Sequence, residues 1–185
     1  LHWGPPGDGQ AIVARRAVQE AFLRTLPTNA TGESLYGGVE ALPLPATSSP
    51  DGEWLAFTTG LRDFTEDLAH QVAVFRQTDD VWQEVVRVAL DDAAGWPDYV
   101  DDSAFTFLTE PDKSTWLLLS AGVGAHSGTC SVLRYNGRIL TVDGNSGNSS
   151  PVACGVTDIN DDGFDDVLLD RTDYYVFCYA CAIRE

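Results

Sequence analysis

Gln71-Val72-Ala73-Val74-Phe75, followed by Trp82-Gln83-Glu84-Val85-Val86-Arg87-Val88, is the stretch that decides the fold class of this chain. Both runs are rich in β-branched and aromatic residues, which suit the pleated, half-buried surface of a strand. Asp79-Asp80 between them is a typical turn pair, because Asp side chains bond to nearby backbone groups. The stretch therefore predicts two antiparallel strands joined by a tight turn.

Similar short runs recur along the chain, at residues 54–58, 104–108, 115–120, 130–135, 138–142, 166–169 and 174–179. Asn136-Gly137 is a strong signal for a two-residue hairpin turn between two of them. About nine strands with short turns predict a mainly β fold, either an antiparallel sandwich or a partly open barrel with propeller-like sheets. A closed propeller needs at least about four blades, which is more than a chain of 185 residues supplies.

The N-terminal part of the chain has a different pattern. Residues 10–26 carry apolar side chains near helical spacing and Pro27 ends the pattern, so we expect one α-helix within residues 1–27. Residues 28–52 are rich in Pro, Gly, Ser and Thr, and we interpret them as a wrapping loop. Residues 53–185 then form the β body of a single domain, which the chain length allows.

The formal charge of −17 excludes some classes of partner. It argues against nucleic-acid binding, because phosphates would be repelled, and it favours solubility and cation binding. No apolar run approaches the ~20 residues of a membrane-spanning helix. The chain contains no Met and begins with Leu1, which is typical of a secreted form whose leader has been removed. The sequence leaves open whether a lipid anchor preceded it.

Residues 158–166, Asp-Ile-Asn-Asp-Asp-Gly-Phe-Asp-Asp, carry the clearest chemistry. Gly163 allows the sharp turn that a chain needs to wrap an ion, and Phe164 would contribute its backbone carbonyl. Carboxylates this close would repel one another without a cation between them. The stretch therefore predicts a structural Ca²⁺ site whose side-chain ligands are Asp158, Asn160, Asp162 and Asp166. The alternative is an acidic surface turn without an ion.

The spacing matches only the first half of an EF-hand loop. The last ligand position of that loop would be Leu169 rather than Glu, and the apolar residues before it are strand-like. Residues 156–170 instead resemble the calcium loops of FG-GAP and VCBS-type repeats, which are found in integrin propeller blades and in secreted bacterial proteins. The resemblance covers this loop alone. It implies a calcium loop that runs directly into a β-strand.

Four cysteines lie in the last third of the chain: Cys130, Cys154, Cys178 and Cys181. An even number in an apparently exported chain predicts two disulfides, for which three pairings exist. We prefer Cys130–Cys154 together with Cys178–Cys181. The C-x-x-C spacing of the second pair does not favour a redox centre, because no helix follows it, and one close pair does not make a four-cysteine zinc site.

Two classes of function remain open from the sequence. The first is an extracellular or cell-surface binding or assembly module, with a protein or glycan partner or with a second copy of itself. The second is a secreted hydrolase centred on His126, which lies next to Ser127 in a glycine-rich turn. Adjacent positions do not by themselves arrange a nucleophile and a base, and the chain has no Gly-x-Ser-x-Gly elbow or His-Glu-x-x-His motif. We therefore expect the binding module.

Overall fold

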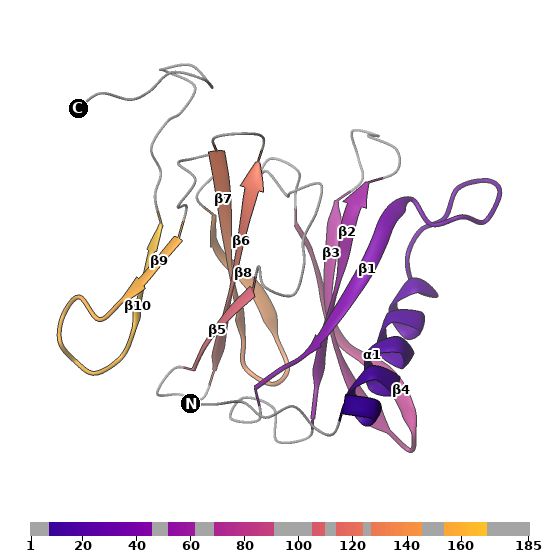
Figure 1. Ribbon diagram of the computed structural model, residues 1–185, viewed down its shortest axis with the longest axis horizontal. Coiled ribbons are helices and arrows are strands. Elements are labelled where there is room, and N and C mark those ends of the chain that lie inside the picture. The colour runs from indigo at the N-terminus through magenta and orange to yellow at the C-terminus, as the bar shows by residue number, and fades with distance from the viewer. Residues whose placement is uncertain are drawn as a thin grey trace.

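The computed structural model describes residues 8–45, 52–61, 69–90, 105–109, 114–123, 127–145 and 154–169 (Figure 1). Within these ranges one helix precedes ten strands. The elements are α1 (Asp8–Leu23), β1 (Tyr36–Pro43), β2 (Trp54–Leu61), β3 (His70–Thr78), β4 (Val81–Leu90), β5 (Phe105–Thr109), β6 (Thr115–Val123), β7 (Ser127–Tyr135), β8 (Leu140–Asn145), β9 (Cys154–Thr157) and β10 (Asp166–Leu169).

The strands form three antiparallel sheets that follow one another along the chain. The first has the order β1-β2-β3-β4, the second has the order β5-β6-β7-β8, and β9 pairs with β10 in a separate hairpin. Figure 1 shows them as successive layers, with α1 at one end and the β9–β10 hairpin at the other. The prediction of a mainly β, antiparallel fold with one N-terminal helix is confirmed, and the two larger sheets pack as a sandwich.

The core between the two larger sheets uses alternate positions on each strand, because successive side chains of a strand point to opposite faces. In β2, Leu55 and Phe57 face the second sheet, whereas Trp54 and Ala56 face α1. Fully burying a large apolar side chain contributes ~1.5–3 kcal/mol, so this layer is a main source of stability. Its buried residues are Leu42, Leu44, Leu55, Phe57, Val72, Val74, Leu90, Leu117, Leu119, Leu133, Tyr135 and Leu140.

The helix covers the outer face of the first sheet. Val18 and Phe22 are buried there, four residues apart as the helical pattern predicted, and Leu26 packs with them although α1 ends at Leu23 rather than at Pro27. The ring of Phe22 packs edge-on against Phe75 of β3, with 5.9 Å between centroids. The guanidinium of Arg87 lies over the same Phe22 ring, 5.1 Å from its centroid. This cation–π contact connects β4 to the C-terminal part of the helix.

The β9–β10 hairpin lies on the outer face of the second sheet. Val167 and Leu169 of β10 pack against Leu118 and Val132 of that sheet. A disulfide joins Cys130 of β7 to Cys154 of β9, with their Cα atoms 5.7 Å apart. The preferred pairing is confirmed for these two cysteines, and Cys178 and Cys181 lie outside the described residues.

The interpretation of residues 28–52 as a wrapping loop is wrong, because β1 lies within it. Gly37 and Gly38 of β1 lower the strand propensity of the sequence, but the close packing of this edge strand against β2 requires glycine at both positions. A Cβ atom on Gly38 would lie 2.9 Å from the Thr59 hydroxyl, and one on Gly37 would lie 3.1 Å from the Thr59 carbonyl. Pro43 ends the strand at the edge of the sheet, where a missing N–H is tolerated.

The turn at Asn136-Gly137 also differs from its prediction. Tyr135 pairs with Leu140, so the hairpin loop has four residues rather than two. The Asn136 side-chain oxygen accepts hydrogen bonds from the amides of Arg138 (3.2 Å) and Ile139 (2.9 Å), which stabilises the longer loop. The predicted strand at 174–179 lies outside the described residues, and β9 had no sequence signal of its own.

Candidate functional site

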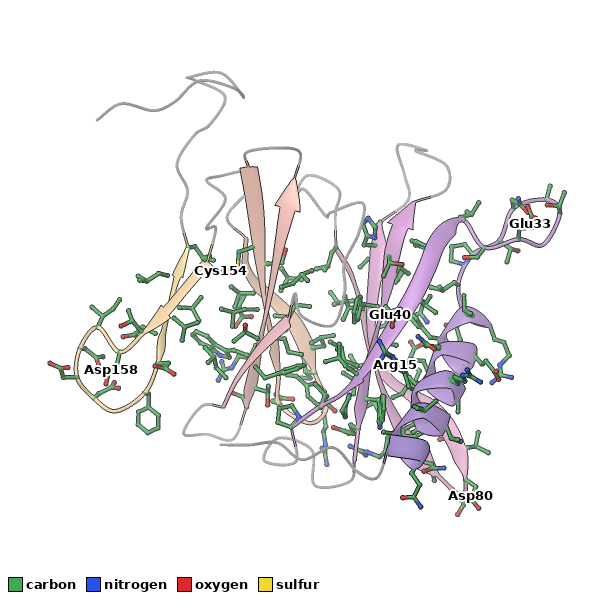
Figure 2. The ribbon with its side chains drawn as sticks, in the orientation of Figure 1. Arg15, Glu33, Glu40, Asp80, Cys154 and Asp158 are labelled. Atoms are coloured by element: carbon green, nitrogen blue, oxygen red, sulfur yellow. A yellow bond between two sulfur atoms is a disulfide. The ribbon has the colours of Figure 1, made fainter. Side chains whose placement is uncertain are left out.

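The predicted calcium loop joins β9 to β10, and the two strands hold its ends together. Thr157 pairs with Asp166 across the hairpin, and the ladder continues to Cys154 and Leu169. Gly163 adopts a φ of 89°, the left-handed conformation expected where a chain turns around an ion. Asp161 also has a positive φ, at 58°. Figure 2 shows the loop, marked by Asp158, projecting from the far end of the molecule.

The predicted ligand side chains are all folded back onto the loop. Asp158 accepts hydrogen bonds from the amides of Asp162 (3.1 Å) and Gly163 (2.8 Å), one on each carboxylate oxygen. The Asn160 side chain bonds to the Asp162 amide (3.0 Å) and to its carboxylate (3.0 Å). Asp166 accepts from the amide of Ile159 (2.9 Å). Each predicted ligand side chain therefore bonds to an amide of the same loop, and calcium binding stays a prediction.

The loop carboxylates are not arranged around a common centre. Across the described ranges, no three Asp, Glu, His or Cys side chains are gathered as a group that could hold a metal ion. Asp162 and Phe164 are exposed, and Asp158 and Asp166 are only half-buried, so water can solvate the carboxylates. To bind Ca²⁺, the carboxylates would have to exchange some of their hydrogen bonds with loop amides for bonds to the ion.

A buried carboxylate joins the two larger sheets at one end of the sandwich. Glu53, immediately before β2, is 1% exposed. Its Oε1 atom accepts two hydrogen bonds from the Arg76 guanidinium, one of them from Nε at 2.9 Å. Its Oε2 atom accepts a hydrogen bond from the Tyr135 hydroxyl at 2.9 Å. Burial and the neighbouring Glu53 carboxylate raise the pKa of Tyr135, so its hydroxyl remains a donor.

His70 is a second buried ionisable group, at the start of β3. Burial lowers its pKa to about 4, so the ring is neutral near pH 7. The Thr58 hydroxyl lies 3.2 Å from His70 Nδ1 and accepts a hydrogen bond from the Gln71 amide at 3.0 Å. The Thr58 hydroxyl donates to Nδ1 or accepts from it according to which ring nitrogen carries the proton. Only 2% of the residue is exposed, so it is a structural group rather than a base open to substrate.

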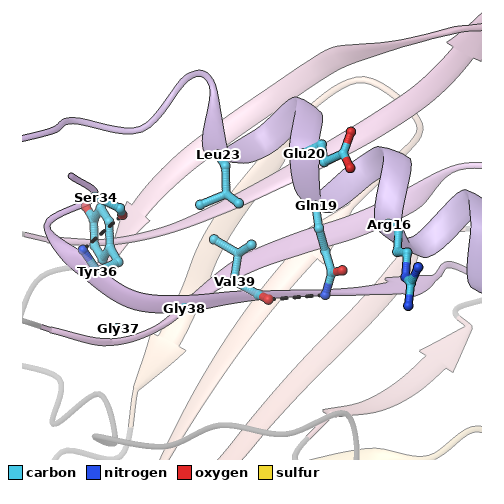
Figure 3. Close-up of a pocket in the computed structure, with 9 residues that line it drawn as sticks. All are labelled: Arg16, Gln19, Glu20, Leu23, Ser34, Tyr36, Gly37, Gly38 and Val39. Atoms are coloured by element: carbon cyan, nitrogen blue, oxygen red, sulfur yellow. Dashed lines mark hydrogen bonds between the residues drawn. The ribbon is translucent and has the colours of Figure 1, made fainter. Parts of the chain in front are cut away.

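Two grooves run along the flanks of α1. One, of about 390 Å³, lies between α1 and β1 (Figure 3). In it, the Gln19 side chain donates a hydrogen bond to the Val39 carbonyl (3.2 Å). The helix therefore supplies a hydrogen-bond partner to one backbone carbonyl of β1. The other, of about 420 Å³, lies between the opposite flank of α1 and the β3–β4 turn. No sequence pattern predicted either groove, because each depends on how the helix docks.

The remaining predicted site falls outside the described residues. His126, the centre of the hydrolase alternative, is among residues 124–126, which the structure does not describe.

Within the described ranges, no helix is long and apolar enough to span a membrane.

The fold and the loop were compared with known proteins. The chain matches no protein-family model, and the comparisons with curated proteins and with solved structures find no significant match. The function must therefore be argued from the loop itself.

Proposed function

We propose that this chain is a calcium-binding β domain of the extracellular space or cell surface, and that it acts as a binding or assembly module. The observation that carries the proposal is the loop of residues 158–166, in which all four predicted ligand side chains accept hydrogen bonds from amides of the same loop. Ca²⁺ prefers carboxylate, amide and backbone oxygens in a flexible arrangement, and this loop offers all three kinds.

Electrostatics supports an ion at this position. Asp158, Asp162 and Asp166 point into one short loop, and Lys and Arg are absent from residues 154–169. In a chain of net charge −17, no long-range positive field offsets their mutual repulsion. A divalent cation would offset two of these three negative charges and lock the loop to β10.

The structural context favours the FG-GAP and VCBS-type resemblance over an EF-hand. An EF-hand loop leads into a helix, whereas this loop leads directly into β10. The preceding residues form β9, so the loop spans a β-hairpin. In this reading the ion has a structural role, holding together a hairpin that has only four residues in each strand.

The extracellular location rests on the disulfide. Such bonds persist in oxidising compartments and are rare in the cytosol. Cys130 and Cys154 form one, between β7 and β9. An exported β domain with a structural ion is a common scaffold for recognition, and we assign the module class on that ground, with a protein, glycan or self-association partner.

The test is the effect of calcium on thermal stability. A ligand that binds only the native state raises stability by RT ln(1 + [L]/Kd), which is about 2.7 kcal/mol at a hundred times Kd. We expect Ca²⁺ to raise the Tm of the parent protein and EDTA to reverse the increase. Asp162→Asn should remove most of this shift, because it deletes one ligand charge without changing size.

Asp161→Asn is the matched control. Asp161 is the neighbouring exposed carboxylate, its side chain is not among the predicted ligands, and Asn tolerates its positive φ. This variant should keep the calcium shift. Equal shifts in the parent, Asp162→Asn and Asp161→Asn proteins would refute the assignment of the loop, and no shift in the parent would refute calcium binding altogether.

A further inference from the structure

The groove between α1 and the β3–β4 turn has the composition of a ligand site. Its size, about 420 Å³, falls within the ~300–1,000 Å³ that small-molecule sites occupy. It lies at the opposite end of the molecule from the β9–β10 loop, where Figure 2 shows Asp80 beside the start of α1. An inference about this groove is therefore independent of the calcium proposal.

One wall of the groove is apolar and open. Ala14 and Ala17, one turn apart on α1, are too small to fill the space in front of Trp82. Val13 is 68% exposed beside them. Trp54 packs edge-on against Trp82, with 6.2 Å between ring centroids, which fixes the orientation of the indole. The result is a rigid aromatic side chain next to accessible apolar surface, the usual platform for a flat ligand.

The rim of the groove is polar and has unused hydrogen-bonding capacity. Gln10 on the helix and Gln77 with Asp80 on the hairpin line it. All three are exposed, and within the described residues their side chains make no hydrogen bond to another residue. Each amide can both donate and accept, and the carboxylate accepts at two oxygens. This combination suits a ligand that carries several neighbouring hydroxyl groups.

The backbone at the rim forms the two-residue turn that joins β3 to β4, and a turn of this kind requires positive φ at both central residues. Asp79 and Asp80 both have positive φ, 50° and 62°. A two-residue hairpin turn of this kind favours Gly at its second position, because a side chain there costs roughly 1 kcal/mol. The chain instead places a carboxylate at that position. Strain of this kind is often retained where the side chain has a function.

Charge restricts the ligand further. Asp79 and Asp80 lie side by side, and the chain as a whole carries a charge of −17, so an anionic ligand would be repelled. A pyranose ring presents C–H groups on one face and hydroxyls at its edge, which matches the apolar wall and the polar rim. We propose that this groove binds a neutral, hydroxyl-rich glycan, with a sugar ring against Trp82 and its hydroxyls bonded to Gln10, Gln77 and Asp80.

The proposal is tested by calorimetric titration of the whole chain with neutral oligosaccharides. The probes are the hexasaccharides of glucose in β-1,4 and α-1,4 linkage, of mannose, and of N-acetylglucosamine, with hexagalacturonate as the anionic control. We expect at least one neutral probe to bind with a Kd below about 10 mM, and the anionic probe to bind more weakly. Absence of binding by every neutral probe, or tighter binding of hexagalacturonate, would overturn the proposal.

Variants then locate the site. Asp80→Gly should raise the Tm, because it relieves the backbone strain, and should weaken binding by about tenfold or more, because it removes a charged acceptor. Gln77→Ala should also weaken binding, and it avoids any folding defect that replacing Trp82 could cause. Gln83→Ala, an exposed amide of β4 outside the groove, should leave affinity unchanged. Unaltered affinity in both Asp80→Gly and Gln77→Ala would place the sugar elsewhere and refute the site.

The calcium-loop variant Asp162→Asn separates this test from that of the proposed function. It should bind the oligosaccharide as the parent does, because the two sites lie at opposite ends of the molecule (Figure 1). Loss of sugar binding in this variant would contradict the independence of the groove.

Discussion

Replacing Tyr135 with Phe removes a single hydroxyl from the junction between the two larger sheets. That hydroxyl donates a 2.9 Å hydrogen bond to Glu53 Oε2, and the carboxylate is 1% exposed. Water therefore cannot take the place of the lost donor without opening the core. A hydrogen bond to a charged group contributes ~1.5–3 kcal/mol, roughly twice the value for a neutral acceptor. We expect Tyr135→Phe to lower the free energy of unfolding by about 2–3 kcal/mol.

The chain offers a close control for this change. The hydroxyl of Tyr36 is also buried in a core, but it donates to a neutral acceptor, the Ala69 carbonyl, at 2.6 Å. Tyr36→Phe should therefore cost only ~0.5–1.5 kcal/mol. Both variants lose one oxygen atom and no apolar packing, so the main difference between them is the charge of the acceptor.

Urea unfolding followed by circular dichroism measures both variants. The slope m should stay unchanged, and the midpoint should fall further for Tyr135→Phe than for Tyr36→Phe. In a thermal scan, where each kcal/mol corresponds to ~2–4 °C for a chain of this size, Tyr135→Phe should lower the Tm by about 4–12 °C. If Tyr135→Phe costs no more than Tyr36→Phe, the reasoning from a buried, charged acceptor is wrong.

Two further predictions concern His70 and the disulfide. Burial lowers the folded-state pKa of His70 to about 4 from 6.5, so the unfolded chain binds more protons between these values and stability falls as the pH drops from 6.5 towards 4. The loss should reach roughly 3 kcal/mol and should be absent from His70→Gln, compared by urea unfolding across this pH range; parallel pH profiles would contradict the assignment. Replacing Cys130 and Cys154 together with Ser opens a crosslink of sequence separation 24, and by the chain-entropy relation this should cost about 3.5 kcal/mol. A loss well under 1 kcal/mol in the same assay would mean that the crosslink hardly restricts the unfolded chain.

The sequence predicted the elements whose signals are local. The runs around Val72 and Val86 alternate or cluster as strands do, and Asp79-Asp80 between them is a turn, so β3 and β4 followed directly. The loop from Asp158 to Asp166 was found for the same reason, because all of its side chains lie within nine consecutive residues. A feature whose parts are neighbours in the chain can be recognised without knowing the fold.

The features that sequence did not predict depend on contacts between distant residues. Glu53 is separated by 23 residues from Arg76 and by 82 from Tyr135, and nothing near it marks it as buried. β1 was missed because Gly37 and Gly38 reduce strand propensity, while the benefit they bring is a close approach to Thr59 that only the paired sheet reveals. The groove beside Trp82 exists only because α1 docks across the sheet.

These two kinds of feature meet at the β9–β10 hairpin. A two-stranded hairpin of four residues in each strand is marginal by itself in water. Here Val167 and Leu169 pack on the second sheet, and the Cys130–Cys154 bond fixes the end of the hairpin farthest from the loop. Among the described residues the loop end has no comparable support, since Ile159 and Phe164 are exposed and the ligand carboxylates bond to the loop itself. A divalent ion at the loop end would therefore complete the attachment that the disulfide begins, and its stabilising effect should be concentrated in this hairpin rather than spread through the sandwich.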